Sequence, residues 1–292
     1  MLNSVLVFAT YFFLIAAICS LWLRARFPIW SLFFVASFLF GVISGVLSPA
    51  AIIPTILLVL AGYGLKHATV SNQNRLLIKI VAGCGVVLIS LGLALHLFPG
   101  FHNYKTFSGI FLSPGAVPYT QHFSYDKAMA GLFLMAFFIP LARRGDQRRY
   151  ALSRAFTTTL ILVLVVMPIA WVIGYVGFAP KFPDSFFLWA VTNLFSTCVA
   201  EEAFFRGFFQ RNLAEYLTRK VIYGQWFAFG IVSIVFGLAH FGGGLVYMGL
   251  AFIAGLGYGW IYLKTNRIEA SIFTHFSFNV VHFTLFSYPS LT

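Results

Sequence analysis

Charged side chains are scarce in this chain. Asp, Glu, Lys and Arg make up only 9% of its 292 residues, whereas 60% of the residues are hydrophobic. A soluble domain carries about 25% charged residues, which keep its surface hydrated. The shortage of charge therefore excludes a soluble globule and predicts an all-α, polytopic transmembrane bundle.

Cysteine is also rare, and its spacing excludes two kinds of site. The three cysteines, Cys19, Cys84 and Cys198, lie far apart within apolar runs and form no Cys-x-x-Cys pair. Such positions are typical of buried free thiols. They predict neither a disulfide framework nor a metal site built from sulfur.

Several catalytic signatures are missing as well. No serine sits in a Gly-x-Ser-x-Gly turn, and no helix carries the zinc-binding pattern His-Glu-x-x-His. The three aspartates, Asp126, Asp146 and Asp184, fall in loops or at the ends of apolar runs. A serine hydrolase and an aspartate-based membrane dyad are therefore not expected, and the case for zinc is weakened.

The apolar runs divide the chain into about ten candidate spans, each long enough to cross most or all of a bilayer at 1.5 Å per residue. We predict spans near residues 4–23, 27–47, 50–65, 80–98, 128–142, 155–178, 185–211, 224–240, 245–263 and 269–287. The first six spans form an N-terminal transmembrane region, residues 1–184, which can govern substrate access. Residues 185–292 form the expected catalytic core.

Basic residues set the predicted topology. The net charge is +12, but the basic residues form short clusters between apolar runs and not a stripe, so no nucleic-acid partner is expected. Fifteen of the 19 Lys and Arg residues fall in loops on one side, and only Lys105, Lys127 and Lys181 fall on the other. The side rich in Lys and Arg is cytoplasmic. Both termini are therefore predicted to face away from the cytoplasm.

Ionisable residues inside spans are costly and mark functional sites by default. In the seventh span, Glu202 and Arg206 stand four residues apart and share a helix face, which predicts a supporting ion pair. Glu201 lies about 100° around the helix from Glu202, on a face with Phe205. It is the candidate general base.

Two further groups of polar residues follow along the chain. Phe236 precedes His240 by one helical turn, and the glycines 242–244 come directly after this histidine. His275 and Asn279 are again four residues apart and share a face of the last span. Together with Glu201 these residues fit two chemistries. Either His240 helps Glu201 to activate a water while His275 and Asn279 stabilise an oxyanion, or His240 and His275 bind zinc.

The three ordered motifs resemble those of the CAAX protease and bacteriocin-processing family of intramembrane proteases. They are Glu201-Glu202-x-x-x-Arg206, Phe236-x-x-x-His240 and His275-x-x-x-Asn279, and the resemblance covers residues 185–287. It implies an all-helical endopeptidase of the glutamate or metalloprotease type, in which Glu201 activates water and His240, His275 and Asn279 complete the site. The cofactor is then either none or zinc.

The expected substrate is a membrane-associated protein or peptide, and the lipid bilayer is the surrounding partner. We expect an integral protein of a bacterial plasma (inner) membrane. Two alternatives stay open: an ion-coupled transporter with a carboxylate at the membrane midplane, and a non-catalytic peptide-binding or immunity protein with the same fold. Carriers usually show repeated halves, whereas the polar residues here cluster in one third of the chain.

Overall fold

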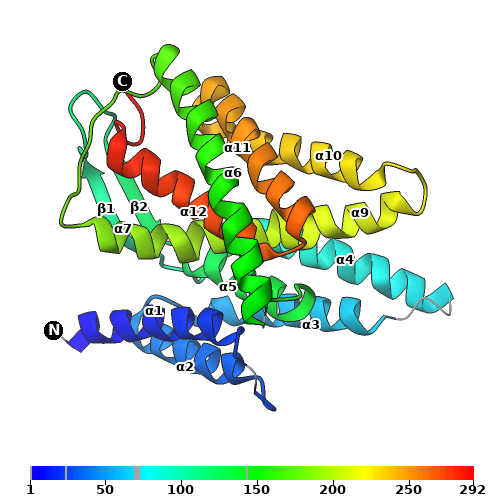
Figure 1. Ribbon diagram of the computed structural model, residues 1–292. Helices are drawn as coiled ribbons and strands as arrows, with labels where there is room; N and C mark the ends of the chain where they lie inside the picture. Colours follow the sequence, from blue (N-terminus) through cyan, green and yellow to red (C-terminus); the bar gives the residue numbers. More distant parts are fainter. Residues whose placement is uncertain (1, 24, 69–72, 143) are drawn as a thin grey trace. The chain divides into compact units, whose positions relative to one another are not determined.

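The computed structural model of the protein describes residues 2–23, 25–68, 73–142 and 144–292, and most of these residues are helical. The longer helices are α1 (Leu2–Ser20), α2 (Ile29–Ser44), α3 (Ile52–His67), α4 (Gln73–Ala94), α5 (Tyr125–Phe138), α6 (Gly145–Val172), α10 (Gly224–Leu238), α11 (Gly244–Thr265) and α12 (Ile268–Leu285) (Figure 1).

Each of the ten predicted spans contains a helix. Among the residues that the structure describes, five helices are long and apolar enough to cross a bilayer, and two shorter apolar helices, α2 and α10, accompany them. Many large apolar side chains, such as Phe8 and Val172, point outward, as expected of surfaces that face lipid. The full count of ten spans and the orientation of the termini stay predictions. Arg24 and Arg143, which contribute to that orientation, lie outside the described residues.

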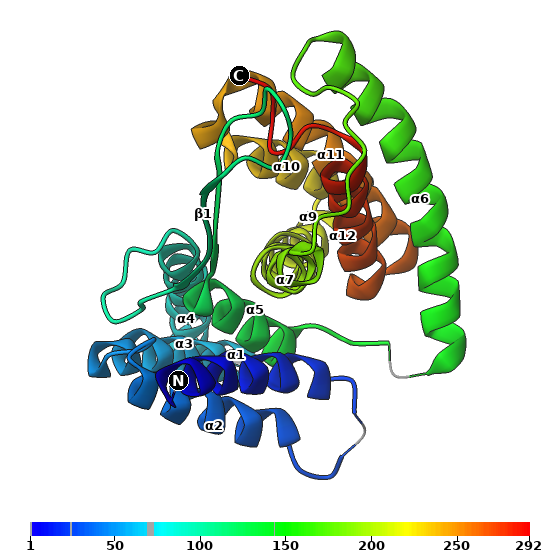
Figure 2. The same cartoon turned by 90° about the vertical axis from the view of Figure 1, so that its left-hand side faces the viewer.

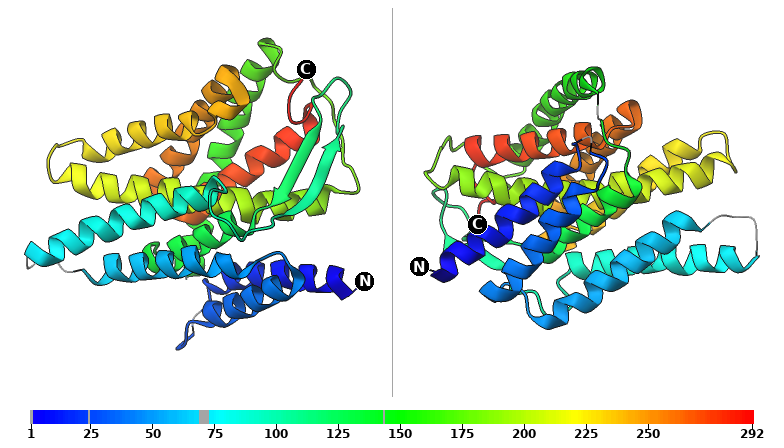
Figure 3. Two further views of the ribbon diagram at one scale, coloured as in Figure 1. Left: turned by 180° about the vertical axis from the view of Figure 1, so that it is seen from behind. Right: turned by 90° about the horizontal axis from the view of Figure 1, so that it is seen from below.

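A β-hairpin interrupts the helical pattern. Strand β1 (Tyr104–Ile110) pairs with strand β2 (Tyr119–Phe123), and Figure 3 shows the two strands side by side. The segment is rich in aromatic residues and threonine, which favour strands, and Thr106 donates a hydrogen bond across the pair to the carbonyl of Gln121. The hairpin lies between two predicted spans, 80–98 and 128–142, and the described chain outside it is mostly helical, as an all-α bundle predicts.

The chain divides into two compact units. The first comprises residues 1–104, 123–141 and 195–200, and the second comprises residues 105–122, 142–194 and 201–292. These units are defined by packing. The predicted division at residue 184 is a functional one, based on the motifs, and stays a prediction.

In the first unit α1 packs against α2, and α3 packs against α4. Polar groups join these helices at buried positions. The Ser37 hydroxyl of α2 donates to the Thr10 carbonyl of α1 at 2.7 Å. Near the start of α5, His96 Nδ1 lies 2.7 Å from the buried carboxylate of Asp126.

In the second unit α6 runs beside α11 and α12, as Figure 2 shows, while α10 pairs with α11. Their packed apolar side chains form a core that includes Leu162, Phe236 and Tyr258. Phe236 of the second motif belongs to this core, and so does Phe278, which lies within the third motif.

The first motif lies on a helical run with two wide turns. The run consists of α7 (Phe186–Thr192), the π-helical η2 (Asn193–Cys198), α8 (Val199–Glu202), the π-helical η3 (Ala203–Gln210) and α9 (Arg211–Thr218). π-helical turns are rare and often occur at functional sites. Here they flank the two glutamates, Glu201 and Glu202, on both sides.

Two glycines of α10 provide a test of the packing against α11. A Cβ atom at Gly237 would lie 2.8 Å from Phe252 Cβ and 3.1 Å from the Met248 carbonyl oxygen, whereas a Cβ at Gly230 would meet nothing within 4 Å. We expect Gly237→Ala to lower the free energy of unfolding by about 1–3 kcal/mol. Gly230→Ala, the matched control, should be neutral or stabilise by up to about 1 kcal/mol. Thermal unfolding of the two variants in detergent measures the difference, and equal stabilities would contradict the close packing.

Candidate active site

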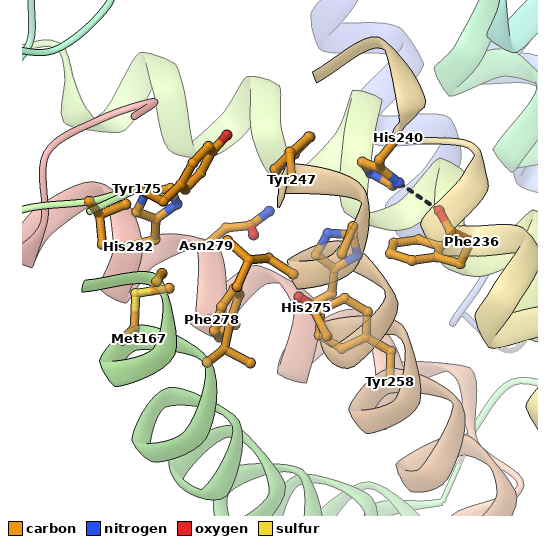
Figure 4. A pocket seen from close by; sticks show the side chains of 16 residues that line it. Met167, Tyr175, Phe236, His240, Tyr247, Tyr258, His275, Phe278, Asn279 and His282 are labelled. Atoms are coloured by element: carbon orange, nitrogen blue, oxygen red, sulfur yellow. Dashed lines mark hydrogen bonds between the residues drawn. The ribbon is translucent and has the colours of Figure 1, made fainter. Parts of the chain in front are cut away.

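The second unit contains a cavity of about 70 Å³ into which two of the sequence motifs converge. Its lining includes Phe236 and His240 from the second motif and His275 and Asn279 from the third. The rest of the lining is mainly apolar and comes from α6, from Tyr175 and Val176 just after it, and from α11 and α12 (Figure 4). A cavity of this volume has room for water beside the polar side chains of the two motifs.

His275 is held from two sides. Its Nδ1 atom lies 2.8 Å from Glu202 Oε1, and its ring stacks on Tyr258 at a centroid distance of 4.4 Å. A carboxylate accepts hydrogen bonds only, so the proton of this contact belongs to Nδ1. The Nε2 atom of a neutral His275 ring is then unprotonated and can accept a proton.

Glu202 is the centre of this arrangement. Its carboxylate is fully buried, and Oε1 also accepts a hydrogen bond from Arg206 Nη1 at 3.0 Å, the contact that the four-residue spacing predicts. The Ser271 hydroxyl donates to Oε2 at 2.5 Å. Burial of a carboxylate is tolerated when such donors surround it.

Arg206 extends the network to two further helices. Its side chain is fully buried, and Nη2 donates to the Gly255 carbonyl of α11 at 3.0 Å. The guanidinium also lies over the ring of Phe236 in α10, 4.2 Å from the ring centroid. Because the arginine neutralises Glu202, the buried pair carries no net charge beside His275.

His240 lies at the end of α10, just before the short helix η4 (Phe241–Gly243). Its Nδ1 atom lies 2.7 Å from the Phe236 carbonyl oxygen, which can only accept, so Nδ1 donates. Gly244 then reverses the chain into α11 with φ at +87°, a conformation that favours glycine. The reversal places His240 between α10 and α11, and Figure 4 shows it above His275 in that view.

Asn279 of the third motif also lines the cavity, as does His282 three residues later. Its Nδ2 atom donates a hydrogen bond to Asn193 Oδ1 at 3.1 Å. An amide group carries two N–H donors and one acceptor oxygen. Asn279 and His275 line the same cavity, so a group bound there lies beside both side chains.

Glu201 is placed differently from the other predicted catalytic residues. It is half-buried and does not belong to the described residues that line the cavity. Its carboxylate does lie within electrostatic range of Arg206 and of Tyr247, whose ring contacts His240 and lines the cavity. The assignment of Glu201 as the base stays a prediction.

A zinc site would need His240 and His275 as ligands together with at least one further donor. Both histidines direct Nδ1 to a protein oxygen and keep Nε2 for another contact. Across the described parts of the chain, however, no three His, Cys, Asp or Glu side chains are grouped to hold a metal ion. The donor set does not fit a three-ligand zinc site, and no step below uses a metal.

Three residues of the site were not predicted from the sequence. Ser271 stands one helical turn before His275, so the four-residue spacing that links His275 to Asn279 also pointed to it. Tyr258 lies between Gly257 and Gly259, outside all three motifs. Met167 of α6 lines the cavity without any local polar signal.

The helical run offers two Arg–Glu pairs at the same spacing, one buried and one exposed. Arg206→Gln leaves Glu202 buried without its cation and should cost about 3–5 kcal/mol of unfolding free energy. Arg211→Gln, which removes the exposed pair with Glu215, should cost less than about 1 kcal/mol.

Chemical unfolding in detergent without added lipid measures both losses. The double variant Glu202→Gln/Arg206→Gln should regain part of the stability lost in Arg206→Gln, because no buried charge is left uncompensated. Similar losses for the two single variants would contradict a special role for the buried pair.

Comparison with known proteins agrees with this geometry. Residues 183–281 match the family model described as "Type II CAAX prenyl endopeptidase Rce1-like". No curated protein matches the chain. No solved structure matches it either. The family match and the apolar helices support an integral membrane protein with a peptide or protein substrate and the general activity of a CAAX-type protease. The resemblance predicted from the three motifs, to the CAAX protease family, is therefore confirmed over residues 183–281.

Proposed function

We propose that the protein is an intramembrane endopeptidase that hydrolyses a peptide bond of a membrane-associated protein or peptide. The observation that carries the proposal is the shared cavity of His240, His275 and Asn279, within the segment that matches the protease family. A bacterial plasma membrane is the proposed location.

Glu201 is proposed to take a proton from the attacking water, and His240 orients that water through its Nε2 atom. The resulting hydroxide adds to the carbonyl carbon of the scissile bond, whose oxygen becomes an oxyanion. Asn279 donates an N–H to this oxygen. His275 takes up a second proton on Nε2 from solvent before the attack, and this N–H also donates to the oxyanion. Collapse of the intermediate breaks the C–N bond, and Glu201 returns its proton to the leaving amine.

Glu202 is proposed to act through His275 without touching the substrate. Its contact at 2.8 Å fixes which ring nitrogen faces the cavity, in the way that a carboxylate orients a catalytic histidine in other hydrolases. Ser271 and Arg206 hold the carboxylate in turn. The second glutamate is thus a positioning residue, and the first is the proposed base.

The variant Glu201→Gln tests the base directly. It preserves the size of the side chain, and loss of a general base lowers rates by about 10²–10⁴-fold. Asp184→Asn is the control, because it removes one exposed carboxylate in a loop away from the cavity. The measurement compares the termini of membrane proteins in cells that express each form.

We expect peptide termini that are present with the wild type and with Asp184→Asn to disappear with Glu201→Gln, while all three proteins accumulate equally. Unchanged termini in Glu201→Gln would refute the proposed protease. Loss of solute uptake with no accumulated precursor would identify the transporter alternative.

A further inference from the structure

A second cavity in the same unit is lined mainly by polar side chains that the proposed protease does not use. It measures about 610 Å³ and lies among the end of η3, α9, the first turn of α10 and the end of α11. Its lining includes Arg211, Arg219, Gln225 and Asn266, together with two buried residues, Gln210 and Tyr262.

The two buried residues each leave a polar atom without a hydrogen bond. Gln210 is 2% exposed and Tyr262 is 5% exposed. Among the described residues, neither Gln210 Oε1 nor the Tyr262 hydroxyl has a hydrogen-bond partner. The Gln210 amide is also fixed, because its Nε2 donates to the Gly259 carbonyl at 3.1 Å. Both residues line the cavity, and each of these two atoms exposes less than 1 Å². A buried acceptor and a buried hydroxyl without partners are costly unless a ligand or water serves them.

The charges of the lining select the class of ligand. Arg211 and Arg219 bring two cations, and the single acid, Glu215, already accepts from Arg211 Nε at 3.0 Å. A guanidinium has five N–H donors in a planar fork, which suits a phosphate oxygen pair. Gln210 Oε1, by contrast, needs a donor such as a hydroxyl. An anion that carries hydroxyl groups satisfies both.

The turn beside the cavity favours a lipid over a soluble phosphate. Between α9 and α10 it exposes Ile222 (90% exposed) and Tyr223 (66% exposed), next to the basic pair Arg219 and Lys220. Exposed apolar and aromatic groups beside basic ones are typical of the membrane interface. In the predicted topology this turn faces the cytoplasm, where anionic headgroups attract basic segments.

We propose that this cavity binds the headgroup of an anionic glycerophospholipid. Arg219 and the Tyr262 hydroxyl donate to the phosphate, and Gln210 Oε1 accepts from a headgroup hydroxyl. The apolar turn at Ile222 lies against the acyl chains. A lipid bound there contacts both the helical run that contains the first motif and the end of α11.

Native mass spectrometry of the purified full-length protein tests the site. Titration with phosphatidylglycerol is compared with titration with phosphatidylcholine. We expect the wild type to prefer phosphatidylglycerol. Arg219→Gln should weaken that binding about tenfold and Tyr262→Phe about threefold to tenfold, because each removes a donor to the phosphate. Lys220→Gln is the matched control, since it removes the neighbouring charge outside the cavity lining and should change binding little.

Each result decides the proposal. An unchanged preference in both Arg219→Gln and Tyr262→Phe would overturn it, provided that their thermal unfolding without lipid equals that of the wild type. An equal loss in Lys220→Gln would also overturn it, because general surface charge would then explain the binding. Displacement of phosphatidylglycerol by free glycerol phosphate at equal concentration would replace the lipid with a soluble phosphate as the ligand.

Discussion

A buried carboxylate must be surrounded by donors, and Glu202 meets this requirement with side chains from two separate segments of the chain. Arg206 Nη1, His275 Nδ1 and the Ser271 hydroxyl all lie within 3.0 Å of its oxygens. Removal of any one donor leaves part of a buried charge without compensation. Glu202 therefore ties α8 and η3 to α12, and it fixes the orientation of the histidine that faces the cavity.

Two hydrogen bonds, four residues apart on each side, join the helical run to α11. Arg206 donates to the Gly255 carbonyl, and Gln210, four residues later, donates to the Gly259 carbonyl, also four residues later. A Cβ atom at Gly255 would lie 2.9 Å from the Phe236 ring, and one at Gly259 would lie 3.1 Å from Gln210 Oε1. Glycine at both positions thus permits the close approach that these two hydrogen bonds need. One contact supports the candidate active site, and the other supports the polar cavity.

The sequence predicted what lies along one helix better than what lies between helices. The spacing of Glu202 and Arg206 predicted their ion pair, and long apolar runs predicted the helices. The contact of Glu202 with His275 joins residues 73 positions apart. Helical periodicity shows which side chains share a face of one helix. Which part of the chain packs against that face depends on how the whole unit folds, and the spacing of residues along one helix does not reveal it. The stacking of Tyr258 on His275 was not predicted because it also joins two different helices. The hairpin of β1 and β2 was not predicted because it lies outside the apolar runs that define the spans.

The contact with Glu202 places the His275 proton on Nδ1 and leaves Nε2 for the cavity. Solid-state nitrogen NMR of protein labelled at histidine reads this tautomer directly, with the His275 signals assigned by their absence in His275→Gln. We expect a protonated Nδ1 in a strong hydrogen bond in the wild type, and loss of that signature in Glu202→Gln. A neutral His275 protonated at Nε2, unchanged by Glu202→Gln, would contradict it.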